Sequence, residues 1–169
     1  GYRSHQTDTC GLHIHVSRNA FGIYDDEQDK AIARILYFVE RNWNELLIFS
    51  RRTQRQLDRW ASRYGYKDRP SEMLEHVKKG GSRYTCVNLS NRDTIEFRIF
   101  RGTLKLNTLI ATLQLVDHIC SLAMMLSDDE IRNLSWSGFV GSVSEPELIQ
   151  YLKERKLYIN DPVESEVEL

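Results

Sequence analysis

The stretch RYTCVNLSNRDTIEFRIFRGT, residues 83–103, contains two runs of strand-forming residues separated by a turn. The runs cover residues 83–89 and 94–101, and they are rich in β-branched and aromatic side chains. The SNRD between them has the composition of a tight turn. This stretch therefore predicts a β-hairpin.

The second strand of this hairpin carries charged residues at every other position. Glu96, Arg98 and Phe100 should share one face, because successive side chains of a strand point to opposite sides. The other face is apolar and consists of Ile95, Phe97 and Ile99. We therefore expect a carboxylate and a guanidinium to lie next to each other on the polar face.

Another strand is predicted within CGLHIHVSRN, residues 10–19. Residues 10–17 alternate, which is the period of a half-buried strand. His13 and His15 share its polar face, and the opposite face holds Leu12, Ile14 and Val16. The chain thus has two strands with unusual polar faces, although periodicity alone does not make them neighbours.

Helical spacing of apolar residues predicts the remaining elements. The predicted helices cover residues 25–47, 71–79, 107–125 and 144–156. The last one begins with a capping box in which Ser144 is the cap and Glu147 follows three residues later. Together with the strands, these helices predict the α+β class, with an antiparallel sheet packed against several α-helices.

Residues 51–69 contain seven basic and two acidic side chains. If this segment is helical, four arginines form one stripe: Arg52, Arg55, Arg59 and Arg63. The stripe fits a solvated helix face, a contact to nucleic acid, or a clamp for phosphates and carboxylates. Nucleic acid is the weakest of the three, because the chain has a net charge of −1 and no recognisable reading motif.

The composition, 41% hydrophobic and 28% charged, is that of a folded domain. The most apolar region, residues 109–126, contains Gln114, Asp117 and His118, so we expect no membrane span. Three cysteines without a C-x-x-C spacing indicate reduced thiols rather than disulfides. We therefore expect a cytoplasmic protein with one domain over residues 1–157 and an acidic tail over 158–169.

The polar faces of the two strands suggest a metal or phosphate site. Imidazole and carboxylate groups together bind divalent ions, and Arg83, Arg98 and Arg101 near the Glu96 strand support phosphate handling. The simpler alternative is a solvent-facing histidine pair beside a surface ion pair. A cupin and a metal-dependent hydrolase barrel both fit poorly, since the chain has too few strands for the first and is short for the second.

Several blocks of this sequence resemble the amidoligase family of carboxylate-amine ligases, which have a glutamine synthetase-like fold. The blocks are CGLHIHVSR, the arginine-rich segment, SRYTCVNL and TIEFRIFRGTL followed by a helix, and they extend from residue 10 to about 125. The resemblance implies a partial barrel and a ligase that phosphorylates a carboxylate with ATP, after which an amine displaces phosphate. Small-molecule or peptide carboxylates and amines are the implied substrates.

The resemblance also implies roles for individual residues. His13 and Glu96 would ligate Mg²⁺ or Mn²⁺, and Arg98 would neutralise the transferred phosphoryl group as the catalytic residue. His15, Arg83 and Arg101 would contact the ATP phosphates. Weaker candidates for substrate contact are Arg52, Arg55 and Asn88. Such a division agrees with the chemistry, because phosphoryl transfer depends mainly on positioning and charge compensation.

One feature of the family pattern is absent from this sequence. Related enzymes carry further acidic metal ligands on strands before the H-x-H strand, whereas the residues before Cys10 include only Asp8 as an acid. We therefore expect the C-terminal part of a larger catalytic domain, completed by an upstream segment or a second chain. Two other functions stay open: a non-enzymatic module that binds an acidic partner through the arginine-rich segment, and a metal-dependent amide hydrolase.

Overall fold

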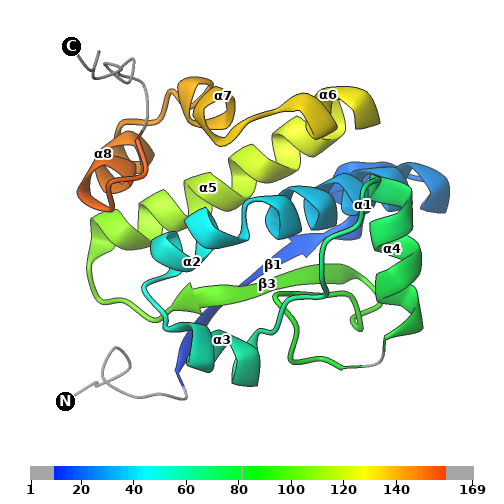
Figure 1. The fold of residues 1–169 in the computed structure, drawn as a ribbon, viewed down its shortest axis with the longest axis horizontal. Helices are drawn as coiled ribbons and strands as arrows, with labels where there is room; N and C mark the ends of the chain where they lie inside the picture. The colour runs from blue at the N-terminus through cyan, green and yellow to red at the C-terminus, as the bar shows by residue number, and fades with distance from the viewer. Residues whose placement is uncertain (1–9, 81, 159–169) are drawn as a thin grey trace, which may run out of the picture.

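The computed structural model describes residues 10–80 and 82–158, which form an α+β fold (Figure 1). Strands β1 (Gly11–Ser17), β2 (Val87–Asn88) and β3 (Thr94–Arg101) make one antiparallel sheet in the order β1-β3-β2. Short helix η2 (Arg18–Phe21) follows β1, and the α-helices are α1 (Asp25–Arg41), α2 (Trp43–Ser50), α3 (Gln54–Trp60), α4 (Pro70–Lys79), α5 (Leu106–Met125), α6 (Asp128–Asn133), α7 (Trp136–Gly141) and α8 (Pro146–Glu154). The predicted fold class is confirmed.

The core lies between the sheet and the helices stacked on one side of it. In Figure 1, α1, α2 and α5 lie on one side of β1 and β3, and α3 lies on the other. The apolar face of β3 is buried as predicted, with Ile95, Phe97 and Ile99 at most 1% exposed. Phe49 of α2 packs edge-on against Phe100 of β3, with ring centroids 5.9 Å apart. One face of the sheet is therefore sealed, which leaves the other for polar side chains.

Pairing between β1 and β3 is irregular at His13. Leu12 is opposite Phe100 but Ile14 is opposite Phe97, so β3 has one extra residue in this interval. Such a bulge reverses the alternation of side chains beyond it. The predicted position of Phe100 beside Glu96 and Arg98 is therefore wrong: its ring is 2% exposed and packs in the core.

The predicted helix over 25–47 is interrupted at Asn42. Backbone angles of φ −103° and ψ 32° take Asn42 out of the helical conformation, and its side-chain Nδ2 donates to the carbonyl of Phe38. Asparagine competes for backbone groups in this way, which favours helix ends. The apolar periodicity continues across the break, so the sequence pattern did not reveal it.

The first strand of the predicted hairpin is shorter than 83–89. Only Val87 and Asn88 pair with β3, opposite Phe97 and Glu96. Thr85 instead forms a parallel bridge with Ser62, and the Cys86 amide donates to the Ser62 carbonyl. The hairpin is confirmed, but Thr85 and Cys86 of its first strand pair with Ser62, in the segment that follows α3.

The last predicted helix begins one residue later than expected and ends at Glu154 rather than at about Lys156. The cap of α8 is Glu145 rather than Ser144, and Pro146 occupies the first helical position. Proline favours that position because its fixed φ suits a helix and it has no amide hydrogen to satisfy. The predicted helices over 71–79 and 107–125 are confirmed within one residue as α4 and α5.

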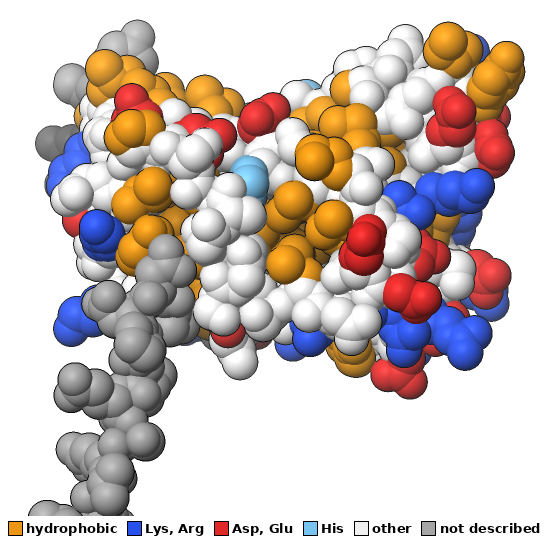
Figure 2. All heavy atoms as spheres, turned by 90° about the horizontal axis from the view of Figure 1, so that it is seen from above, with side chains coloured by type: hydrophobic (Ala, Val, Ile, Leu, Met, Phe, Trp, Pro, Cys, Tyr) orange, Lys and Arg blue, Asp and Glu red, His pale blue; other side chains and the backbone are white. Residues whose placement is uncertain are grey.

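Helix α5 is long and apolar enough to cross a membrane by length and composition, but 44% of its most apolar window is buried within the fold. Leu115 and Ile119 pack in the core, where α5 contacts α1 and α8. Figure 2 shows the face of the molecule that carries helices α5, α6, α7 and α8, and hydrophobic side chains lie across the middle of that face. Localisation stays a prediction.

Candidate functional site

The polar faces of β1 and β3 converge on one carboxylate. Nδ1 of His13 lies 2.9 Å from Oε1 of Glu96, and Nε2 of His15 lies 3.6 Å from the same oxygen. His15 is directly opposite Glu96 in the strand register. The two motifs that the sequence placed on separate strands are therefore neighbours, as the shared-site hypothesis requires.

Glu96 is almost fully engaged by donors from its own sheet. Nη1 of Arg98 lies 3.1 Å from Oε1, and Nδ2 of Asn88 donates to Oε2 over 2.9 Å. Glu96 is 5% exposed, and Asn88 is 4% exposed. Asn88 was a candidate for substrate contact, but its amide orients Glu96, and its Oδ1 accepts from the Ser90 amide.

Arg52 joins this group from the segment that follows α2. Its backbone follows α2, where Arg51 adopts a left-handed conformation with φ 60° and so turns the chain back towards the sheet. The Arg52 guanidinium is largely buried and donates through Nη1 to the Arg98 carbonyl at 3.4 Å. We call the set His13, His15, Arg52, Asn88, Glu96 and Arg98 the Glu96 cluster.

The bulge in β3 decides the position of Arg101. Arg101 is opposite Gly11, which lies on the same side of β1 as His13 and His15. Simple alternation from Glu96 would have put Arg101 on the core face instead. Its charge also lies near Arg52, since Arg98 and Arg101 both help to lower the Arg52 pKa, after the larger effect of burial. Arg101 therefore lies on the polar face, where a phosphate ligand would have to lie.

The electrostatics of the Glu96 cluster favour a neutral His13 beside an ionised Glu96. Burial lowers the pKa of His13, and the charge of Arg98 lowers it further, whereas Glu96 raises it. For Glu96, burial raises the pKa, but the Asn88 hydrogen bond and the Arg98 charge more than offset this effect, so the net pKa is lowered. A carboxylate only accepts hydrogen bonds, so His13 donates from Nδ1 and keeps its Nε2 lone pair.

Positive charge exceeds negative charge around the Glu96 cluster. Within the described residues, Nε of Arg98 is buried without a hydrogen-bond partner. The Arg98 guanidinium also lies over the ring of Tyr84, with Cζ 5.6 Å from the centroid. A buried donor without a partner is costly, so it marks a position where an anionic group would be stabilised.

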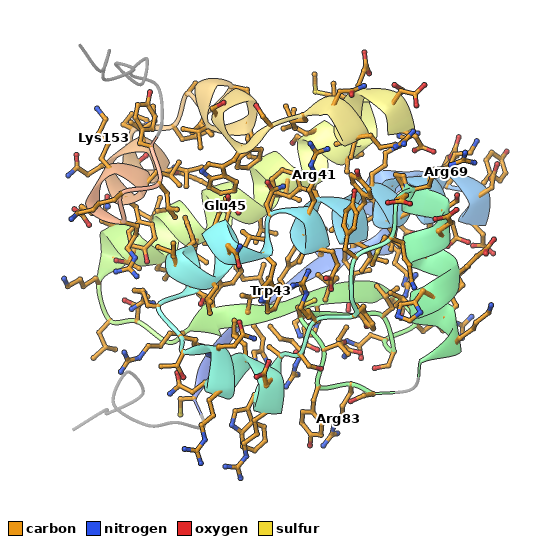
Figure 3. The ribbon with its side chains drawn as sticks, in the orientation of Figure 1. Arg41, Trp43, Glu45, Arg69, Arg83 and Lys153 are labelled. Atoms are coloured by element: carbon orange, nitrogen blue, oxygen red, sulfur yellow. The ribbon has the colours of Figure 1, made fainter. Side chains whose placement is uncertain are left out.

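Arg83 reaches this region through Tyr84. Its Nη2 donates to the Tyr84 hydroxyl over 2.8 Å, and its Cζ lies 4.9 Å from that ring centroid. Figure 3 shows Arg83 at the outer edge of the molecule, on the side of the sheet that bears α3. Sequence reasoning did not select Tyr84, because a single aromatic residue in a loop carries no periodic signal.

The predicted arginine stripe does not form, because the segment is not one helix. Arg52 precedes α3 and belongs to the Glu96 cluster, whereas Arg63 follows α3 and binds buried Glu40 at 2.8 Å. Only Arg55 and Arg59 remain together as exposed side chains on α3. No hydrogen bond or ion pair connects Arg55 to the Glu96 cluster among the described residues.

The described residues alone do not make a metal site. They contain no group of three or more His, Cys, Asp or Glu side chains that could hold a metal ion. Glu96 supplies the one carboxylate of the cluster, and its oxygens already accept from His13, Arg98 and Asn88. Mg²⁺ or Mn²⁺ normally prefers several oxygen ligands. This donor set does not fit such an ion without ligands from elsewhere.

Comparison with protein-family models, with curated proteins and with solved structures found no match to this chain. The resemblance to amidoligases thus rests on the sequence blocks quoted above. The predicted site residues that the fold brings into one cluster are His13, His15, Arg52, Asn88, Glu96 and Arg98.

Proposed function

We propose that this chain forms the phosphate-binding wall of an ATP-dependent carboxylate-amine ligase. The observation that supports this proposal is the Glu96 cluster, where two polar strand faces meet and a buried Arg98 nitrogen has no partner among the described residues. Such a cluster stabilises an anion through guanidinium groups, which match phosphate oxygens with two parallel hydrogen bonds.

The proposed reaction has two steps. A substrate carboxylate oxygen attacks the γ-phosphorus of ATP, and the bond from that phosphorus to the bridging oxygen of ADP breaks. An amine then attacks the acyl carbon, loses a proton and releases inorganic phosphate, so that an amide remains. In this proposal Arg98 and Arg52 offset the charge on the transferred phosphoryl group, which is the main contribution a protein makes to such chemistry.

His15 and Arg101 have supporting positions in this proposal. His15 is half exposed, and its Nδ1 lies 3.1 Å from Thr94 Oγ1, which fixes the ring at the rim of the cluster. Arg101 lies further along the same face, opposite Gly11. We assign both to the nucleotide phosphates. A metal-dependent step would need acidic ligands for the divalent ion from an upstream segment or a second chain.

Nucleotide binding is the most direct test. We expect ATP to bind the purified chain in calorimetry, and His15→Ala to weaken binding severalfold without unfolding, because this side chain is half exposed. Arg98→Lys should weaken binding by about tenfold or more, the loss expected for a charge-assisted contact worth about 1.5–3 kcal/mol. Arg132→Ala, an exposed charge on α6, is the matched control and should bind normally.

Product analysis separates the ligase from the other two functions. ADP release that requires both a carboxylate and an amine supports the proposal. Absence of ATP binding with and without Mg²⁺ or Mn²⁺ would overturn it, as would amide cleavage without nucleotide, which indicates a hydrolase. Salt-sensitive binding of an acidic peptide that is lost in Arg55→Ala and Arg59→Ala but kept in His15→Ala would indicate a binding module instead.

A further inference from the structure

A cavity lies outside the Glu96 cluster, where the end of α2, the start of α5 and helix α8 meet. In Figure 1 these three ends lie together at one end of the molecule. The cavity has a volume of about 400 Å³, which is within the range of small-molecule sites. Its lining residues are Arg51, Thr103, Leu104, Lys105, Thr108, Tyr151, Glu154 and Arg155. None of them belongs to the Glu96 cluster.

Cations outnumber anions in this cavity. Arg51, Lys105 and Arg155 face one carboxylate, that of Glu154, whose Oε1 accepts from Gln150 at 3.3 Å. Like charges that line one cavity repel one another, and the repulsion is stronger beside a buried group such as Tyr151 than in open water. An anionic ligand in the cavity would relieve this repulsion.

Two of these cations are held in place by backbone carbonyls. Arg155 donates from Nε and Nη2 to the Ile48 carbonyl, over 3.0 and 2.7 Å, and Arg51 donates from Nη2 to the Arg101 carbonyl over 2.8 Å. Each bond uses part of a guanidinium that has five N–H donors. The remaining donors are therefore positioned at little further entropy cost for a ligand.

The first turn of α5 adds a third favourable feature. Lys105 is the N-cap residue, and no side chain caps the helix. A helix N-terminus carries partial positive charge, so a lysine at this point is unfavourable and an anion is favourable. Thr103 Oγ1 accepts from the Lys105 amide, which leaves the following amides without a side-chain cap. Lys105 and Thr108 of this first turn line the same cavity as Arg51 and Arg155.

We propose that this cavity binds a small molecule through a phosphate or carboxylate group. The guanidinium and ammonium groups would hold the anion, the hydroxyls of Thr103 and Thr108 can donate to it, and Leu104 offers apolar surface for the rest of the ligand. The site does not depend on the proposed ligase activity. Arg51 and Arg52 are consecutive and contact carbonyls of the same strand, so the cavity and the Glu96 cluster share β3.

Amide chemical shifts of the full chain can test this site with two probes, sodium phosphate and sodium succinate, at constant ionic strength. We expect at least one probe to shift the amides of residues 103–108 and 155 in a saturable way. The probe that binds more tightly identifies the group as phosphate or carboxylate. Shifts around Glu96 would report the other site and are followed separately.

Lys105→Ser is the decisive variant, because serine removes the charge and also supplies a helix cap, so α5 should remain folded. It should weaken probe binding at residues 103–108 by about fivefold or more. Lys79→Ser makes the same change on α4, at the other end of the molecule (Figure 1), and should leave binding unchanged. Equal weakening by both variants, or no saturable shift with either probe, would overturn the proposal.

Discussion

Gly11 shows how one missing side chain makes room for the Glu96 cluster. A Cβ atom at this position would meet Nη2 of Arg52 and would lie 3.2 Å from Nε2 of His13. The guanidinium of Arg52 therefore occupies space that any other residue would fill. Because the conflict involves the end of a flexible side chain, a substitution here should move Arg52 rather than unfold the sheet.

Gly11→Ala should therefore separate the site from the fold. We expect displacement of Arg52 to weaken ATP binding by about tenfold, the loss of one charge-assisted contact, while the melting temperature changes little. Calorimetry and thermal unfolding measure the two effects. Gly80→Ala is the control, since a Cβ there meets only the Val77 carbonyl at 3.6 Å. Unchanged ATP affinity in Gly11→Ala would show that Arg52 does not contribute.

Among the elements, α3 is the one whose boundaries most affect the site. Thr53 caps this helix: its Oγ1 accepts from the Gln56 amide, and Gln56 Oε1 accepts from the Thr53 amide. The cap directly follows Arg52, so the start of α3 fixes the backbone position from which the Arg52 side chain extends. The same S/T-x-x-E/Q pattern caps α6, with Ser127 and Glu130.

Thr53→Ala should destabilise the protein by about 1 kcal/mol, the usual cost of losing a helix cap. Denaturant unfolding would show this as a lower midpoint with an unchanged slope. The change should also weaken ATP binding, because Arg52 directly precedes the cap and would be held less firmly. Arg55→Ala, an exposed position in the same helix, is the control. Equal stability of the two variants would contradict the role of the cap.

For the whole molecule, the pKa values of two histidines and one tyrosine predict how stability depends on pH. Burial is the largest cause of the lowered pKa of both His13 and His118. Below about pH 6.5 the unfolded chain binds protons that the folded chain excludes, so stability falls as the pH falls. Burial raises the pKa of Tyr64 to about 12. Stability should therefore also fall as the pH rises from about 10.

Urea unfolding at several pH values checks this expectation. The free energy of unfolding should decrease from pH 7.5 to 5.5, and the decrease should be smaller in the double variant His13→Gln/His118→Gln. Tyr64 donates to Thr85 Oγ1 and to the Val87 carbonyl, so its ionisation would also loosen the segment before β2. Constant stability between pH 7.5 and 5.5 would contradict the assignment of two partly buried histidines that stay neutral in the folded protein.

The sequence by itself determined which strands have polar faces and which helices surround them. His13 with His15, and Glu96 with Arg98, were each placed on one face by alternation, because neighbouring residues of a strand are related locally. Helices α4 and α5 followed from their periodicity for the same reason. These features depend on residues that are close in the chain.

Only the tertiary structure decided how these elements meet. The bulge opposite His13 moved Phe100 into the core and Arg101 to the polar face. The turn at Arg51 brought Arg52 to the Arg98 carbonyl instead of into a stripe on α3. Both depend on pairing between segments distant in sequence, where packing and hydrogen bonding outweigh local preference. The local pattern therefore identified the candidate site residues, whereas the pairing of distant segments brought them together.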